Sequence, residues 1–583
     1  MRIEWHVPIE MDDGNVLDAD VFRPDDDGVY PVIMSYGIYG KGLAFQDEIY
    51  AMQWNKLVAK DPTVLEGSTN AYQAWEVTDP ERWVPDGYVV VRVDSRGSGW
   101  SPGFMDPRSL REIADFEQCI QWAGTQPWSS GRVGLLGISY YAVTQWRVAQ
   151  EAPAHLAAMI PWEGYLDYYR GPTHHGGIRS EFQDRWWDTQ VARVQYGVGE
   201  RTLTNPHTGE SIAGPVTLSE EELAANRVDL ISELKRRELD GEWYAERSSD
   251  PTAITVPFLS AANWGGQGIH PTGNFEAFER APAEQKWLEV HGDTHWTHFY
   301  SEYGRALQRR FFDHFLKGID NGWDAQPPVL LNIRRPGEQF EQRTEHEWPL
   351  ARTAWTHYYL GLGEESLGVA PPSSPATAQY QSMGDGLTFW LPVNDDEIEI
   401  TGPIAAKLFV SSPTVDVDLF LVVRLFDTDG AEVTFEGSTD PNTPIAMGWL
   451  RASHRELDRE RSRPYRPYHP HRRRDMLEPG TVYELDVEIW PTCIVVPPGY
   501  RLALTVRGKD YEYSGPLDEY GQSFYYATRG TGGMTHNDPE DRPPEVFDTT
   551  VTVHSSPSQP SYVLLPIIPP DTTSGGNRPR SHP

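Results

Sequence analysis

Two sequence patterns follow one another along this chain, and the change between them near residue 318 limits the folds that it can adopt. Before that point, short β-branched runs alternate with longer segments whose apolar residues recur at about helical spacing. This alternation is typical of a mostly parallel sheet covered by helices. After Pro327-Pro328, short strands of alternating polar and apolar residues predominate, as in a β-sandwich. The sequence therefore predicts an α/β part followed by an all-β part.

Individual elements can be placed within each part. In the α/β part, the expected strands are residues 31–35, 88–94, 132–137, 156–161 and 256–261, and the expected helices include 113–123 and 142–150. In the all-β part, the clearest strands are 404–411, 417–426, 482–490 and 500–506. No internal repeat of fixed period is visible.

The domain boundaries follow from the same patterns. Residues 1–325 are predicted to form the α/β domain. Two stretches within it, about 44–80 and 167–249, are too long for ordinary connections and are interpreted as helical cap insertions. Residues 326–570 are predicted to form the β-sandwich domain. The polar tail 571–583 has nothing to bury and is predicted to be disordered.

Composition excludes several classes of function. The chain has 583 residues, with 50 Lys and Arg against 85 Asp and Glu, so its formal net charge is −35. Such a charge repels phosphate backbones and anionic lipid surfaces, and no apolar run approaches the length of a membrane span. Two cysteines exclude a disulfide framework and a cysteine-based metal site. We expect a cytoplasmic protein that binds neither nucleic acid nor membrane, with homo-oligomerisation left open.

The strongest local signal is the run Arg132–Ala142, in which an apolar strand ends in Gly-Ile-Ser and passes directly into a helix. A serine at such an elbow has a strained backbone and lies at a helix N-terminus, where developing negative charge is favoured. Ser139 is therefore the predicted nucleophile. The usual motif has Gly two residues after the serine, whereas this chain has Tyr141, so an ordinary turn before a helix is the alternative.

A serine hydroxyl is a weak nucleophile and needs a base, which in this type of fold comes after the last strands. The segment Lys286–His298 carries three histidines just past an apolar run. His295 is placed best, on the loop between that strand and the next helix, whereas His291 falls within the strand. His295 is the predicted base, and a structural role is the alternative.

Several motifs along the chain carry a resemblance to one family of enzymes. They are Met11–Pro24, Ile38–Lys41, Asp86–Ser101, Gln126–Trp128, Gly137–Tyr140, Phe312–Gly318 and, in the all-β part, the segments 448–455 and 477–480. Together they resemble the cocaine esterase and glutaryl-cephalosporin acylase family of serine hydrolases, which is related to the Xaa-Pro dipeptidyl-peptidases and α-amino acid ester hydrolases. The resemblance implies an α/β-hydrolase domain with a helical cap, followed by a jelly-roll domain. It also implies a cofactor-free carboxylesterase or acylase that forms an acyl-enzyme with a small ester or amide substrate.

The resemblance also implies roles for single residues. It places the nucleophile on Ser139 and an oxyanion hole on the hydroxyl of Tyr39 and the backbone N–H of Tyr140. It does not supply the acid, because the family has Asp after the seventh strand, where this chain has Gly266. A histidine without an acid partner loses control of its tautomer. Our hypothesis places the acid at the end of the sixth strand, at Glu163.

Alternatives remain at this stage. Asp167 and Asp293 are the other candidate acids, although Asp293 is only two residues from His295, which makes contact with that ring awkward. The same machinery could serve a dipeptidyl-peptidase-type aminopeptidase or a β-lactam acylase, and a free-amine substrate would need an anionic subsite. A catalytically impaired protein whose jelly-roll binds a carbohydrate or a partner is the alternative of another class.

Other histidines and arginines give weaker signals. The pair His174-His175 and the pair His469 and His471 lack a third metal ligand at a convincing spacing, and surface loops are expected for both. The arginine-rich run 461–474 is interpreted as a solvated loop that pairs with the protein's own acids. No metal site is predicted.

Overall fold

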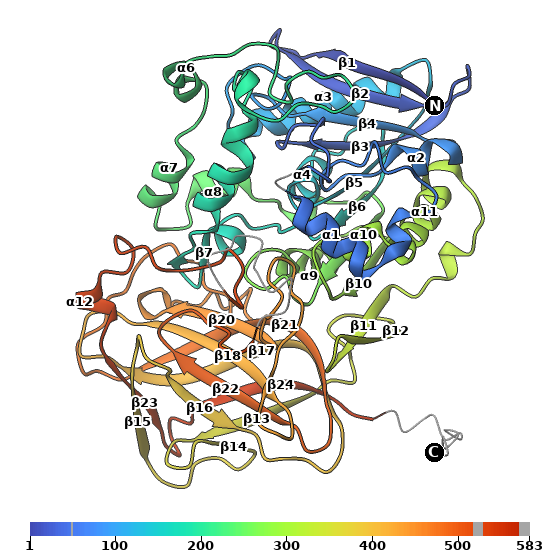
Figure 1. The fold of residues 1–583 in the computed structure, drawn as a ribbon. Helices are drawn as coiled ribbons and strands as arrows, with labels where there is room; N and C mark the ends of the chain where they lie inside the picture. The colour runs from blue at the N-terminus through green and yellow to red at the C-terminus, as the bar shows by residue number, and fades with distance from the viewer. Residues whose placement is uncertain (48–49, 517–528, 571–583) are drawn as a thin grey trace, which may run out of the picture.

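The computed structural model describes residues 1–47, 50–516 and 529–570, which form an α/β domain and an all-β domain in contact with each other (Figure 1). The predicted tail 571–583 lies outside the described residues. Within the described part of the chain, no helix is both long and apolar enough to cross a membrane.

A ten-stranded sheet forms the centre of the α/β domain. Its strand order is β1-β2-β4-β3-β5-β6-β9-β10-β11-β12. The pairs from β4 to β11 are parallel, and the pairs at both edges are antiparallel. The strands are β1 (Arg2–Glu10), β2 (Val16–Arg23), β3 (Tyr30–Gly37), β4 (Val89–Asp94), β5 (Ser129–Ile138), β6 (Leu156–Trp162), β9 (Phe258–Asn263), β10 (Lys286–His291), β11 (Val329–Arg335) and β12 (Gln339–Glu345).

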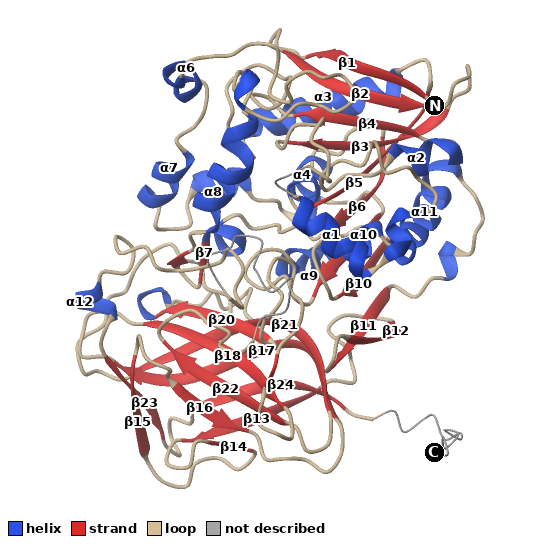
Figure 2. Cartoon of the chain, viewed as in Figure 1, coloured by secondary structure: helices blue, strands red, loops and turns tan. Residues whose placement is uncertain are grey.

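Helices cover both faces of this sheet (Figure 2). Successive residues of β5 and β6 point to opposite faces, so Leu135 and Met159 join one apolar core, whereas Leu136 and Ile160 join another. The first core includes residues of α3 (Leu110–Thr125), α4 (Tyr140–Ala149) and α9 (Pro271–Arg280), and the second includes residues of α11 (Glu302–Lys317). Burial on both faces explains why these strands are almost continuously apolar.

The two long insertions contain short helices rather than further strands of the main sheet. Residues 44–80 include α1 (Ala51–Lys60) and lead into α2 (Pro80–Trp83). Residues 167–249 include α5 (Phe182–Trp186), α6 (Glu220–Ala225), α7 (Leu230–Arg236) and α8 (Glu242–Arg247), with the short hairpin of β7 (His174–His175) and β8 (Ile178–Arg179). Ser219 and Glu222 form a capping box at α6.

In the described part of the second domain, twelve strands form one sheet, which closes on itself because β24 pairs with both β13 and β17. Apart from a parallel contact between β14 and β16, these pairs are antiparallel. The strands are β13 (Ala354–Gly361), β14 (Ser366–Gly368), β15 (Ala376–Gln381), β16 (Leu387–Trp390), β17 (Ile398–Ser411), β18 (Asp418–Phe426), β19 (Glu432–Val433), β20 (Ala446–Arg451), β21 (Tyr483–Val496), β22 (Arg501–Arg507), β23 (Thr550–Ser555) and β24 (Tyr562–Ile568).

The junction between the domains lies close to β11. The predicted boundary at residue 325 precedes β11 and β12, which the structure places on the edge of the first sheet. Arg334 of β11 is buried and donates hydrogen bonds to the carbonyl of Cys493 (2.9 Å) and the hydroxyl of Thr492 (2.9 Å) in β21. A sheet edge of the first domain is thus tied directly to the second domain.

Candidate active site

Ser139 connects β5 to α4 in a strained backbone conformation. Its φ is 56° and its ψ is −113°, and residues other than glycine rarely adopt a positive φ. The turn requires glycine at Gly137, since a Cβ there would lie 2.5 Å from the Cβ of Tyr141. Ser139 therefore has the strained strand-to-helix geometry that exposes a nucleophile at the carboxyl edge of a sheet.

The side chain that contacts Ser139 is His270, which the sequence analysis missed. Its Nε2 atom lies 3.1 Å from Ser139 Oγ. His270 stands immediately before α9, on the loop that follows β9. This is the same loop in which the family's acid was sought at Gly266. The position of His270 in this loop could have indicated it from the sequence, because loops at the carboxyl ends of parallel strands meet at one edge of the sheet.

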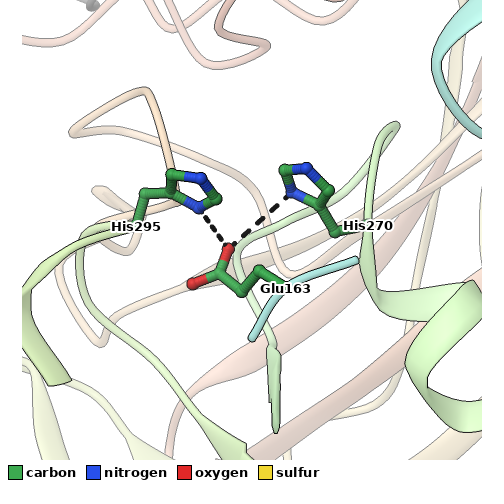
Figure 3. Close-up of side chains that lie close together, drawn as sticks. All are labelled: Glu163, His270 and His295. Atoms are coloured by element: carbon green, nitrogen blue, oxygen red, sulfur yellow. Dashed lines mark hydrogen bonds and ion pairs between the residues drawn. The ribbon is translucent and has the colours of Figure 1, made fainter. Parts of the chain in front are cut away.

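Glu163 and His295 form a tight buried pair (Figure 3). Glu163 Oε2 lies 2.7 Å from Nδ1 of His295. The other two candidate acids are engaged elsewhere, since Asp167 pairs with Arg170 (2.7 Å) and Asp293 with Lys60 (2.9 Å). Of the three acids considered from the sequence, Glu163 is the one that the structure brings to His295.

Both histidines face the same carboxylate oxygen. His270 Nδ1 lies 3.9 Å from Glu163 Oε2 and has no hydrogen-bond partner among the described residues. The two imidazole rings are nearly parallel, with centroids 5.0 Å apart. Burial lowers the pKa of His270 to about 3, so its imidazole is neutral at pH 7 and can accept a proton.

The charge of Glu163 is stabilised from several sides. Its Oε2 atom also accepts a hydrogen bond from Ser438 of the second domain (2.8 Å), and Oε1 accepts from Asn263 (3.1 Å) and contacts His291 (3.1 Å). Burial alone would raise the pKa of Glu163, but His295 and His291 outweigh burial and hold it well below its usual range. Glu163 is therefore a carboxylate.

His295 lies between two carboxyl groups. Its Nε2 atom is 3.4 Å from Oε1 of Glu76, a buried residue of the first insertion. Burial would lower the pKa of His295, but Glu163 and Glu76 raise it to about 10. Burial also raises the pKa of Glu76. At neutral pH, His295 is thus an imidazolium and His270 is the neutral histidine of the pair.

Of the two predicted oxyanion residues, Tyr140 follows Ser139 in the chain and Tyr39 lines the same pocket as Ser139. The backbone N–H of Tyr140 belongs to the first residue of α4, where a helix leaves its N–H groups without intrahelical acceptors. The hydroxyl of Tyr39 accepts a hydrogen bond from the indole of Trp186 (2.9 Å), which fixes the phenol ring. Tyr39 and Ser139 line the same pocket.

That pocket is compact and largely aromatic. It lies between the two insertions, the sheet edge and the second domain, which contributes Thr439. The other lining residues include Tyr39, Trp75, Glu76, Ser139, Phe182, Trp186, His270, His295 and Trp296.

Among the residues that the structure describes, two groups of side chains have the residue types of a metal site. Glu163, His270 and His295 offer ligand atoms within 4.8 Å of one another. Since His270 also contacts Ser139, we interpret this group as acid–base machinery. In the second group, His6 with Asp18 and Asp20, the position of a cation is taken by Lys41, whose Nζ lies 2.9 Å from Asp18 and 3.0 Å from Asp20.

The prediction that two histidine pairs lie in surface loops is wrong. His174, His175, His469 and His471 are all buried, between the second insertion and the all-β domain. His175 Nδ1 lies 2.7 Å from Nε2 of His536. Neutral histidine is small and amphipathic enough to be buried at an interface when its ring nitrogens find partners, which sequence spacing does not reveal.

Comparison with known proteins identifies relatives of both parts of the chain. Residues 13–300 match the model of the X-Pro dipeptidyl-peptidase (S15) family, and residues 321–564 match the C-terminal non-catalytic domain of X-Pro dipeptidyl-peptidases. Among curated proteins, the chain is 24% identical to a cocaine esterase from Rhodococcus sp., over 97% of this chain and 98% of the relative. It is 23% identical to a putative Xaa-Pro dipeptidyl-peptidase from Rhodopirellula baltica, over 83% and 78% of the two chains.

Solved structures agree with the sequence matches. A CocE/NonD family hydrolase from Staphylococcus aureus superposes with a TM-score of 0.84 at 32% identity, over 97% of this chain and 93% of that chain. An α-amino acid ester hydrolase shares the fold, with a TM-score of 0.65 at 15% identity. The S15 and CocE/NonD matches together cover both domains. The chain therefore belongs to the CocE/NonD family of S15-type serine hydrolases.

Proposed function

We propose that this protein is a carboxylesterase or acylase that cleaves small ester or amide substrates through an acyl-enzyme on Ser139. The observation that carries the proposal is the 3.1 Å contact between Oγ of the strained Ser139 and Nε2 of the neutral His270, two residues that line the same pocket. A neutral imidazole at hydrogen-bond distance is the partner that a serine hydroxyl needs to become a nucleophile.

The reaction follows from this geometry. As Ser139 Oγ attacks the substrate carbonyl, its proton passes to Nε2 of His270, and Nδ1–H of the resulting imidazolium faces Glu163. The tetrahedral oxyanion accepts hydrogen bonds from the Tyr39 hydroxyl and the Tyr140 N–H. The imidazolium then returns its proton to the leaving group. A water molecule, deprotonated by the same imidazole, then attacks the acyl-enzyme. The bond to Ser139 Oγ breaks, the imidazolium returns the proton to Oγ, and the carboxylic acid leaves.

His295 is the second candidate base. Its 2.7 Å contact with Glu163 is shorter than that of His270, and its position after β10 is the one that the sequence indicated. In the resting state we assign it the role of a cation held between Glu163 and Glu76. The relative activities of variants at the two histidines separate these assignments.

A second candidate function is an aminopeptidase of the Xaa-Pro dipeptidyl-peptidase type. It is favoured by Glu76, a buried carboxyl group that lines the pocket together with aromatic rings. Such a group could receive the ammonium of a free-amine substrate. Hydrolysis of aminoacyl esters and amides in preference to acetyl esters would select this function.

The proposal also covers the fold of each domain, the cellular location and the binding partners. The strand order and the elbow after β5 support an α/β-hydrolase domain with two helical cap insertions, and the closed antiparallel sheet supports a jelly-roll. The two cysteines are buried and unpaired, which supports a cytoplasmic location. We propose no nucleic-acid or membrane partner and no cofactor, and homo-oligomerisation stays open.

Covalent labelling tests the proposed function. A fluorophosphonate probe should add one adduct per chain to the folded wild type and none to Ser139→Ala, as measured by intact mass, with turnover of p-nitrophenyl acetate and butyrate lost in the same variant. A folded wild type without adduct would contradict the proposal and favour a binding role for the all-β domain.

A further inference from the structure

A chain of alternating carboxyl and imidazole groups runs from the pocket into the sheet. It begins at Glu76, passes through His295 and Glu163, and continues to His291 and Glu289 of β10. The successive closest distances are 3.4, 2.7, 3.1 and 2.7 Å. All five side chains are buried, and each carboxyl group is separated from the next by one imidazole.

The inner end of this chain is firmly anchored. Glu289 Oε2 contacts Nδ1 of His291, and Glu289 Oε1 accepts hydrogen bonds from the hydroxyl of Tyr303 in α11 (3.0 Å) and the amide of Asn332 in β11 (2.9 Å). Tyr303 is half-buried. Both oxygens of Glu289 are therefore engaged, and the imidazole of His291 is fixed in one orientation.

We propose that His291 and Glu289 are positioning residues of the acyl-transfer site, which hold the Glu163 carboxylate ionised and turned toward the two histidines at Ser139. The proposal rests on the proposed function. His291 and Asn263 together fix Oε1 of Glu163, which leaves Oε2 for His295 and for the side of His270. A fully buried carboxylate without such partners would take up a proton and could no longer accept from an imidazole.

The charge of His291 supports this role. Burial would lower the pKa of His291, but Glu289 and Glu163 raise it to about 9. On its other sides, the ring of His291 stacks on Trp162 at the end of β6, with ring centroids 5.0 Å apart. It also faces the ring of His298 in α10 (Thr297–Tyr300), with centroids 5.2 Å apart. His298 is neutral, because burial and the positive charge of His291 lower its pKa to about 4.

His298 provides a matched control. It is partly buried, packs against the ring of His291 and has a carboxylate neighbour in Asp293, but it forms no hydrogen bond with the five residues of the Glu76–Glu289 chain. Replacing His298 by Gln removes a partly buried neutral ring next to His291 without removing a charge. Replacing His291 by Gln removes the charge and keeps an amide that can donate a hydrogen bond.

The test compares pH profiles of kcat/KM for p-nitrophenyl acetate. In His291→Gln, kcat should fall about tenfold or more at pH 7 with little change in KM, and the acid limb should move up by about one pH unit, because Glu163 is protonated more easily. Glu289→Gln should shift the limb in the same direction, and Glu289→Asp should restore most of the wild-type profile. His298→Gln should leave the limb where it is.

A milder variant covers the case in which the buried substitutions prevent folding. Tyr303→Phe removes only a hydroxyl from a half-buried site, and it should move the acid limb upward by a smaller amount. Folded variants that lose activity without a shifted limb, or an equal loss in His298→Gln, would overturn the proposal. A folded wild type that is not labelled by the fluorophosphonate would instead overturn the proposed function.

Discussion

The Oγ atom of Ser139 lies 3.1 Å from Nε2 of His270, a residue of the loop after β9 and not of the loop after β10. His295, on the loop after β10, pairs instead with Glu163. One carboxylate thus faces two imidazoles, of which one contacts the nucleophile and the other is already charged. This division makes distinct predictions for the two histidines.

Replacing His270 should cost more than replacing His295. In His270→Gln the serine loses its proton acceptor, and kcat/KM should fall by about 10³-fold, within the usual range for a general base. His295→Gln keeps the contact between Ser139 and His270 and should lose less. Steady-state kinetics with an ester substrate checks this order. The reverse order would assign the base to His295.

Glu163→Gln should strongly impair catalysis while the protein still folds. The amide keeps the size of the carboxyl group but removes the charge that orients and stabilises the imidazolium, a change that costs up to about 10⁴-fold in the Ser-His-Asp template. Asp167→Asn is the matched control, because Asp167 pairs with Arg170 away from Ser139. Equal activity of Glu163→Gln and the wild type would exclude Glu163 as the acid.

Tyr39→Phe should lower kcat by about 10²-fold, with little effect on KM, because we expect the hydroxyl to stabilise the oxyanion that develops in the transition state. Tyr36→Phe is a suitable comparison. It removes a buried hydroxyl that donates to the carbonyl of Glu112 (3.2 Å), and neither Tyr36 nor Glu112 lines the pocket. A similar loss in both variants would indicate a packing effect.

Acid should weaken the contact between the second insertion and the all-β domain. Burial lowers the pKa values of His174, His175 and His454 to about 3, below the value near 6.5 of an unfolded chain. The native state therefore binds fewer protons, so this contribution to stability is complete above pH 6.5 and declines as the pH falls toward 3. Each histidine contributes a slope of up to about 1.4 kcal/mol per pH unit.

Urea unfolding between pH 8 and pH 5 measures this dependence. In the wild type, the urea concentration at the unfolding midpoint should decrease as the pH is lowered below 6.5. In His454→Gln it should decrease less steeply, because the variant keeps a hydrogen-bonding amide opposite His471 and cannot become charged. An unchanged slope would show that His454 does not contribute to acid sensitivity.

Much of the fold was predictable because its signals are local. The five strands expected in the α/β part overlap β3, β4, β5, β6 and β9, since strands buried on both faces are continuous apolar runs. The clearest strands of the all-β part overlap β17, β18, β21 and β22. The edge strands β11 and β12 were not expected in the first sheet, because an antiparallel hairpin at a sheet edge has the same alternating pattern as a β-sandwich strand.

The sequence by itself determined the elbow at Ser139, since a strand that passes through Gly-Ile-Ser into a helix admits few backbone conformations. It also indicated Glu163 at a strand end, because the carboxyl ends of parallel strands meet at one edge. The tertiary structure alone decided which histidine contacts the nucleophile and that His291 and Glu289 lie behind Glu163. Those relationships depend on distances between side chains more than 100 positions apart, which depend on how strands and loops pack and not on any local pattern.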